Sequence, residues 1–116
     1  MAVDKELLKG TTSTLVLQLL SRKKMYGYEI IQELEILSGG LFEFKEGTLY
    51  PLLHTLEANG YLNSEWFGAE GSRQRKYYVI TKNGRSQLKS KKSEWNEFTK
   101  AIDKIFLGRE AGNESN

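Results

Sequence analysis

The chain of 116 residues is long enough for one domain with one hydrophobic core. Its 28% charged and 39% hydrophobic residues are typical of an ordinary globular protein. The absence of cysteine excludes disulfide scaffolds, cysteine-based metal sites and thiol nucleophiles, and a single histidine argues against a transition-metal centre. No apolar stretch approaches the ~18–20 residues that cross a bilayer, and no secretion signal is visible. We therefore expect a cytoplasmic protein without a cofactor or a bound metal.

The net charge of +2 conceals an uneven distribution. Residues 59–116 carry eleven basic and seven acidic groups, whereas residues 1–58 carry six basic and eight acidic groups. Between Arg73 and Lys92 there are eight basic residues and no acidic one. A local field of one sign attracts polyanions more than the total charge does, although such a run is also typical of a solvated face.

Two helices are predicted at the start of the chain. The first spans Lys5 to about Ser21 and has a broad apolar stripe, which suggests contact on more than one side. The second runs from about Gly27 to Ser38 and ends at Gly39-Gly40, because glycine accepts the left-handed conformation of a helix terminus. The short apolar segment from Leu41 to Phe44 is predicted to be a brief strand.

A third helix and a β-hairpin follow. The helix reaches Ala58, and it is expected to start near Glu46 to Thr48, because Pro51 belongs in an opening turn. The apolar period then changes from 3.6 to 2 over Tyr61 to Phe67 and again over Arg75 to Ile80. These two segments, joined by a glycine-bearing loop, predict a hairpin with a long tip.

The last predicted element is a helix from Thr81, a plausible N-cap, to Leu107. Two series spaced by seven residues run along it: Leu88, Trp95 and Ile102 in the first, and Lys91, Phe98 and Ile105 in the second. At 1.5 Å per residue, this helix extends roughly 39 Å and overhangs so small a domain. We expect its stripe to pair with a second chain, helped by Leu8 and Leu15 of the first helix.

This order of elements is that of a winged helix-turn-helix, a mainly α fold with a small β-hairpin. We assign residues 1–81 to a DNA-binding domain, 82–107 to a long C-terminal dimerisation helix and 108–116 to a disordered tail. In such a fold the third helix enters the major groove, and the hairpin tip contacts the DNA backbone or the minor groove.

The third helix and the hairpin carry residue types that suit contact with DNA. Free N–H groups at a helix start bind phosphate, glycine lets the backbone approach, and hydroxyl, imidazole and cationic groups donate to phosphates or base edges. The expected DNA-binding residues are Lys45, Gly47, Thr48, Tyr50, Pro51, His54, Ser72, Arg73, Arg75 and Lys76. Structural alternatives remain for some of them. In place of DNA contact, Tyr50 and Pro51 would only stabilise the start of the helix. His54 and Arg73 would then be surface residues that contact no partner.

Three segments, in order and at matching distances, carry a resemblance: Tyr26-Gly27-Tyr28-Glu29-Ile30, Thr48 to Gly60 and Arg75 to Gly84. They are similar to the entry into the second helix, the recognition-helix signature and the second wing strand of the PadR-like family of transcriptional regulators. The resemblance covers roughly residues 5–107. At Ser72-Arg73-Gln74 the chain departs from the Gly/Pro-containing turn of many relatives.

The resemblance implies a repressor that binds a near-palindromic site on double-stranded DNA as a homodimer. The single C-terminal helix is similar to that of the smaller subclass, in which some members bind planar aromatic compounds in a pore at the dimer interface. A tryptophan of the last helix lines that pore, and Trp95 is the matching position here. A planar aromatic effector is therefore an expected partner, and a membrane is not. The alternative for Trp95 is a packed interface residue.

The sequence argues against two other classes of function. An enzyme is not expected, because the sequence has no nucleophile–base pair, no GxxxxGK phosphate loop and no convincing pair of carboxylates. A winged-helix module that binds protein instead of DNA is the alternative function. The basic residues expected on the hairpin and the third helix count against it.

Overall fold

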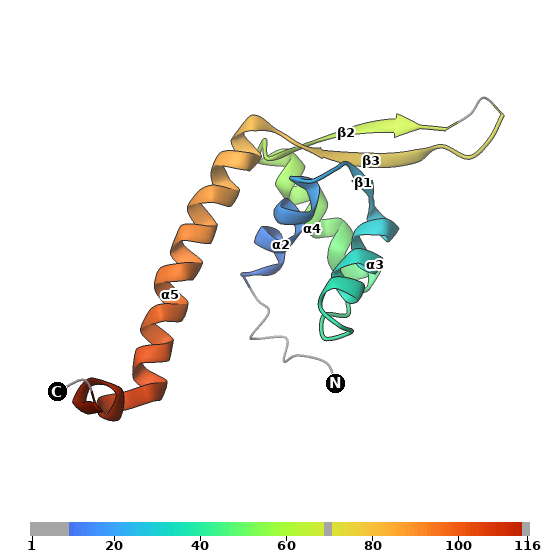
Figure 1. Cartoon of the computed structure of the whole chain (residues 1–116). Helices are drawn as coiled ribbons and strands as arrows, with labels where there is room; N and C mark the ends of the chain where they lie inside the picture. The colour runs from blue at the N-terminus through green and yellow to red at the C-terminus, as the bar shows by residue number, and fades with distance from the viewer. Residues whose placement is uncertain (1–9, 69–70, 115–116) are drawn as a thin grey trace.

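The computed structural model describes residues 10–68 and 71–114, with side chains as far as Gly108. The first helix predicted over Lys5 to Ser21 is not continuous, because Gly10 and Thr11 form a turn in which Gly10 has a φ of 87°. Its predicted start, including Leu8, lies outside the described residues. In chain order the elements are α2 (Thr12–Leu20), β1 (Met25–Tyr26), α3 (Gly27–Leu37), α4 (Glu46–Ala58), β2 (Leu62–Phe67), β3 (Arg75–Ile80) and α5 (Lys82–Glu114) (Figure 1). This arrangement confirms the predicted winged helix-turn-helix with a long C-terminal helix.

The sheet contains one strand more than the predicted hairpin. Its order is β1-β3-β2, and both pairs of neighbouring strands are antiparallel. The two-residue strand β1 pairs Met25 with Tyr78 and Tyr26 with Tyr77, and it was missed because two residues show no period. The strand predicted over Leu41 to Phe44 is wrong, because this segment is irregular and lies between α3 and α4.

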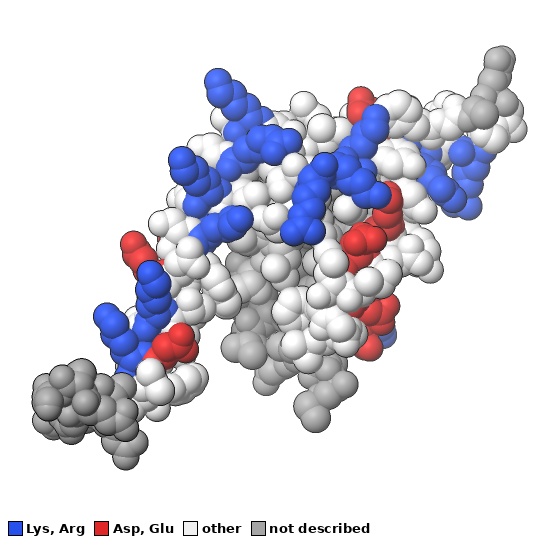
Figure 2. Space-filling view, viewed as in Figure 1, with Lys and Arg blue, Asp and Glu red and all other residues white. Residues whose placement is uncertain are grey.

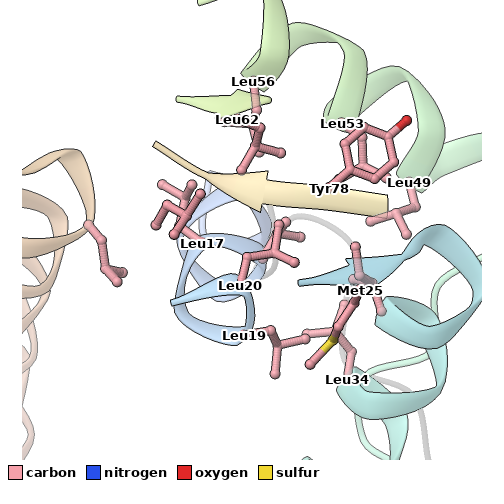
Figure 3. Packing of buried hydrophobic residues seen from close by; sticks show 14 residues of the cluster. Leu17, Leu19, Leu20, Met25, Leu34, Leu49, Leu53, Leu56, Leu62 and Tyr78 are labelled. Carbon is pink, nitrogen blue, oxygen red and sulfur yellow. The ribbon is translucent and has the colours of Figure 1, made fainter. Parts of the chain in front are cut away.

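One hydrophobic core joins the helices to one face of the sheet (Figure 3). Leu62, Tyr78 and Ile80 point from the sheet into this core, as the period-two pattern predicts. Helix α2 contributes Val16, Leu17, Leu19 and Leu20, and α4 contributes Leu49, Leu53 and Leu56. Tyr78 is only 2% exposed, so the core fixes the position of β3 beneath the helices.

The junction between the sheet and α5 is closely packed. As predicted, Thr81 caps the helix: its Oγ1 accepts a hydrogen bond from the Gly84 N–H at 2.9 Å. The same hydroxyl donates to the Gly60 carbonyl oxygen at 2.6 Å, which ties the helix start to the turn before β2. A Cβ atom at Gly84 would overlap the carbonyl oxygen of Tyr61, so only glycine fits this position without a backbone shift.

Beyond this junction α5 leaves the rest of the domain (Figure 1). Its first half packs against α2, where Arg85 donates to the Ser21 carbonyl oxygen at 3.3 Å and Lys92 donates to Gln18 Oε1 at 3.2 Å. Helix α5 continues beyond the predicted end at Leu107 to Glu114 and is interrupted at Gly108, whose backbone is not helical (φ 64°, ψ −159°). The three-part division of the chain, with its disordered tail, stays a prediction.

We predict that Gly84→Ala lowers the free energy of unfolding by about 1–3 kcal/mol, because the new methyl group meets backbone that cannot yield. Urea unfolding followed by circular dichroism measures this loss. Gly47→Ala is the matched control. A Cβ atom at Gly47 meets nothing within 4 Å, so this change should stabilise α4 by up to about 1 kcal/mol. Equal unfolding midpoints for the two variants would contradict the packing described for Gly84.

Candidate nucleic-acid interface

Helix α4 has a buried side and an exposed side. Leu49, Leu53 and Leu56 are buried against the core. The opposite side exposes four of the residues that we predicted to contact DNA: Gly47, Thr48, Pro51 and His54. Four of the residues predicted on α4 are therefore exposed opposite the buried leucines, whereas Tyr50 is not.

The start of α4 offers donors to an anion. Lys45 precedes the helix in an extended conformation and is exposed, and the helix start has no side-chain cap. The Thr48 and Leu49 N–H groups both donate to the Lys45 carbonyl oxygen at 3.0 Å, which leaves the earlier N–H groups of the first turn for another acceptor. Glu46 lies in the same turn, so its carboxylate opposes an anion there.

Tyr50 differs from its neighbours on α4, because its ring is half-buried against α3. A Cβ atom at Gly27 would lie 2.5 Å from Tyr50 Cε1 and 2.6 Å from the Tyr50 hydroxyl oxygen, so glycine makes this contact possible. Burial raises the pKa of Tyr50, and the charge of Glu46 raises it further. The packing against Gly27 favours a structural role for the ring.

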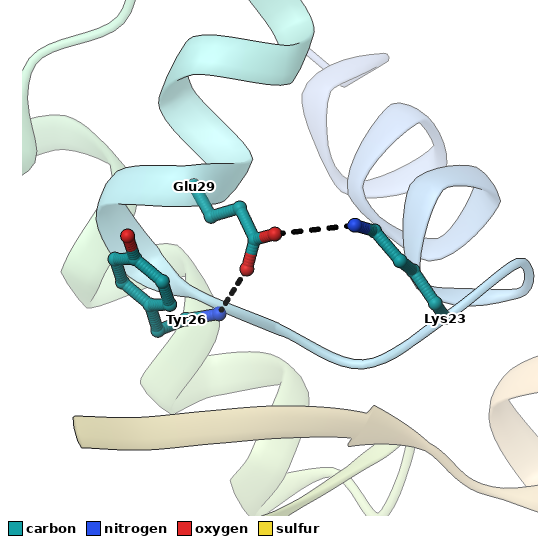
Figure 4. Close-up of polar contacts among 3 residues, drawn as sticks. All are labelled: Lys23, Tyr26 and Glu29. Atoms are coloured by element: carbon teal, nitrogen blue, oxygen red, sulfur yellow. Dashed lines mark hydrogen bonds and ion pairs between the residues drawn. The ribbon is translucent and has the colours of Figure 1, made fainter. Parts of the chain in front are cut away.

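The entry into α3 is fixed by a chain of polar contacts (Figure 4). The backbone N–H of Tyr26 donates to Glu29 Oε1 at 3.4 Å, and Lys23 Nζ lies 3.3 Å from Glu29 Oε2. Glu29 thus satisfies a backbone donor at the helix start and also neutralises a nearby lysine. These contacts hold Gly27 in place beneath Tyr50.

The wing, which we define as β2, β3 and the loop between them, projects past the helices (Figure 1). Ser72 and Arg73 are exposed in the described part of its tip. Arg75 is also exposed, but its guanidinium carbon lies 4.5 Å from the ring centroid of Tyr26. Of the three wing cations, Arg73 is therefore the exposed one that has neither an ion pair nor a cation–π contact within the described part of the chain.

The side chain of Lys76 is held by contacts with Glu57 and Tyr78. Its Nζ lies 3.5 Å from Glu57 Oε1 and 5.3 Å from the ring centroid of Tyr78. Glu57 also accepts a hydrogen bond from the Ser64 hydroxyl, and this hydrogen bond, followed by the charge of Lys76, lowers the pKa of Glu57. Sequence reasoning missed Glu57 and Ser64, although the period-two pattern puts Ser64 and Lys76 on the same face as Tyr78.

The opposite face of the sheet carries a ladder of aromatic rings. Tyr77 meets Tyr26 edge to face at 5.4 Å and Phe67 edge to face at 5.5 Å. Lys24 Nζ lies 3.8 Å from the Phe67 ring centroid and 3.5 Å from Glu65 Oε1. This face therefore joins all three strands, and Tyr77 takes part in packing while Tyr78 belongs to the core.

The residues predicted for a dimer or effector interface fall into two groups. Leu88 is 7% exposed and belongs to the hydrophobic core of its own chain. Leu15 is half-buried and packs against this core. Trp95, Phe98 and Ile105 are 50%, 57% and 76% exposed, while Ile102 is partly covered. The outer half of α5 therefore presents an apolar stripe that the described part of this chain leaves uncovered.

The basic run of the sequence is divided between two places. Arg73, Arg75 and Lys76 belong to the wing, whereas the five cations from Lys82 to Lys92 lie on the first half of α5. Figure 2 shows Lys and Arg side chains gathered along α5 and again toward the wing on the face in view. Among the described residues, no helix has the length and apolarity that a membrane crossing requires.

Comparison with known proteins places this geometry in a family. Residues 16–90 match the family described as "Transcriptional regulator PadR-like family". The chain is similar to a transcriptional regulator from Clostridium thermocellum, with 37% identity and a TM-score of 0.80 over 86% of this chain and 97% of that one. A PadR family transcriptional regulator from Eggerthella lenta is 36% identical, with a TM-score of 0.78 over 87% of this chain and 86% of that one.

A curated protein of Lysinibacillus sphaericus that carries no assigned function is 32% identical over 93% of this chain and 99% of its own length. The family match spans more than half of the chain, and regulators of this family are not enzymes. The fold, the three sequence segments and these similarities lead to one conclusion. The chain belongs to the PadR-like family of transcriptional regulators.

Proposed function

We propose that the chain is a homodimeric repressor that reads double-stranded DNA with α4 and the wing. The observation that carries this proposal is the exposed side of α4, where Gly47, Thr48, Pro51 and His54 stand opposite the buried leucines. Lys45 at the start of α4 and Arg73 at the wing tip give each of the two elements an exposed cation. Such an arrangement suits a helix in the major groove and a wing on the backbone or in the minor groove.

The uncovered stripe on α5 supports the dimer. Trp95 and Phe98 lie on its exposed side with their ring centroids 6.1 Å apart, and Ile105 is 76% exposed further along. Apolar side chains at a seven-residue spacing are covered most directly by a second copy of the same helix. A two-fold dimer would place two α4 helices in successive major grooves about 34 Å apart on a near-palindromic site.

An effector at the dimer interface is the finer part of the proposal. Trp95 is half exposed, so its ring has free surface for a planar aromatic molecule between two copies of α5. Binding there would relieve repression only if the effector prefers a dimer whose α4 helices no longer match the groove spacing.

The direct test is binding of the purified protein to the duplex upstream of its own coding frame, with a scrambled duplex as the control. We expect tight, selective binding that weakens steeply with salt, with a slope of about −0.9 per phosphate neutralised. Analytical ultracentrifugation of the same sample should show a dimer. A protein that binds neither duplex at low salt would contradict the proposal and favour the protein-binding module.

We predict that Arg73→Ala weakens binding to the specific and the scrambled duplex alike, by about three- to tenfold, because it removes a phosphate contact. The log–log salt slope should become shallower by about 0.9. Lys104→Ala removes an exposed cation from the outer half of α5 and serves as the control. A salt slope that stays the same in Arg73→Ala would contradict the contact.

We predict that Trp95→Ala keeps the dimer and loses binding of a planar aromatic dye such as acridine orange, by at least about tenfold, because the stacking surface is gone. Fluorescence titration measures the dye, and ultracentrifugation measures the dimer. Trp66→Ala is the control, because it removes the other tryptophan from the wing. Unchanged dye affinity would contradict the effector site, whereas dissociation into monomers would assign Trp95 to the dimer interface alone.

A further inference from the structure

Glu57 connects α4 to both long strands of the wing. It lies in the last turn of α4, and its carboxylate accepts a hydrogen bond from the hydroxyl of Ser64 on β2. The other carboxylate oxygen lies 3.5 Å from Nζ of Lys76 on β3. One side chain of the helix therefore holds a residue of each strand, and we call Glu57, Ser64 and Lys76 the wing clamp.

The wing clamp is partly shielded from water. The side chains of Lys76 and Glu57 are 28% and 31% exposed, which makes this the least exposed pair among the ion pairs of the described residues. The ammonium group of Lys76 also lies over the buried ring of Tyr78, 5.3 Å from its centroid. Reduced screening and a second hydrogen bond make this pair stronger than a fully exposed ion pair.

The other face of the wing is held as well. Tyr26 of β1 packs edge to face on Tyr77, and Arg75 stacks over the same Tyr26 ring. Because Tyr26 directly precedes α3, the wing is joined to α3 on this face and to α4 on the face of the wing clamp. Free hinge motion of the wing base would break contacts on one face or the other.

We propose that Glu57 and Lys76 are positioning residues that fix the wing against α4, so that Arg73 and α4 reach one duplex together. The inference rests on the proposed function, and it reassigns Lys76 from DNA contact to positioning. A wing that is already oriented loses less conformational freedom when it binds, so breaking the wing clamp weakens binding without removing any group that touches DNA.

Simple electrostatics makes the opposite prediction for Glu57. A carboxylate near the proposed interface repels phosphates, so its loss should strengthen DNA binding if charge alone mattered. If Glu57 positions the wing, its loss should weaken binding. The sign of the change therefore separates the two roles.

We predict that Glu57→Gln, which keeps a hydrogen-bond acceptor but removes the charge, weakens binding to the upstream duplex by about fivefold. Lys76→Met should weaken binding by a similar factor, and the double variant should bind no worse than either single variant, because both changes break the same contact. Glu35→Gln on the exposed side of α3 is the matched control. Tighter binding by Glu57→Gln, or additive losses in the double variant, would overturn the proposal.

A second measurement needs no DNA. In a Trp95→Phe background, Trp66 is the single tryptophan, and it lies on β2 directly across from Lys76. Time-resolved fluorescence anisotropy of Trp66 should show larger local motion in Glu57→Gln and Lys76→Met than in Glu35→Gln. Equal motion in all of these variants would overturn the clamp. If the unsubstituted chain bound no duplex, the proposed function would fail, and the anisotropy would still decide on the clamp.

Discussion

The alternation of side chains along β3 is the constraint on which the rest of the structure depends. As the central strand, β3 pairs on both sides, and it turns Tyr78 and Ile80 into the core and Tyr77 toward the aromatic ladder. A shift of one residue would expose the buried Tyr78 ring and bury Tyr77 in its place. The same alternation brings Lys76 to Glu57, so the register that forms the core also forms the contact between the wing and α4.

The proposed function requires that α4 and the wing reach DNA in one geometry. The core fixes α4 through its leucines, and the two faces of the sheet fix the base of the wing. What remains exposed is the outer side of α4 and the wing tip, where Lys45 and Arg73 have no ion-pair partner among the described residues. Packing separates the cations at the wing: Lys24, Arg75 and Lys76 each lie close to an acid or an aromatic ring, whereas Arg73 at the tip has neither among the contacts of the described residues.

Helix α5 extends beyond the part of the domain that buries its own apolar side chains. The Cα radius of gyration is 17.7 Å, whereas a compact chain of this length has one of about 13 Å. Leu88 lies in the core, but Trp95, Phe98 and Ile105 further along the helix are exposed in the described part of the chain. Exposed apolar surface of this extent is typical of an interaction site, and the proposed dimer would cover it with the same stripe of a second copy.

Local patterns in the sequence determined the helices, the hairpin and the cap at Thr81, because periodicity and capping are properties of neighbouring residues. The outward side of α4 was also predictable, since burying its leucines exposes the residues opposite. Only the tertiary structure decided which cations are free. The sequence alone does not distinguish Arg73 from Lys76, since both are basic residues of the predicted hairpin. In the structure, Lys76 pairs with the carboxylate of Glu57 on α4. Such a contact depends on which faces of the elements meet after packing. The same reason applies to β1, because this two-residue strand is defined by its pairing with β3 and shows no sequence pattern of its own.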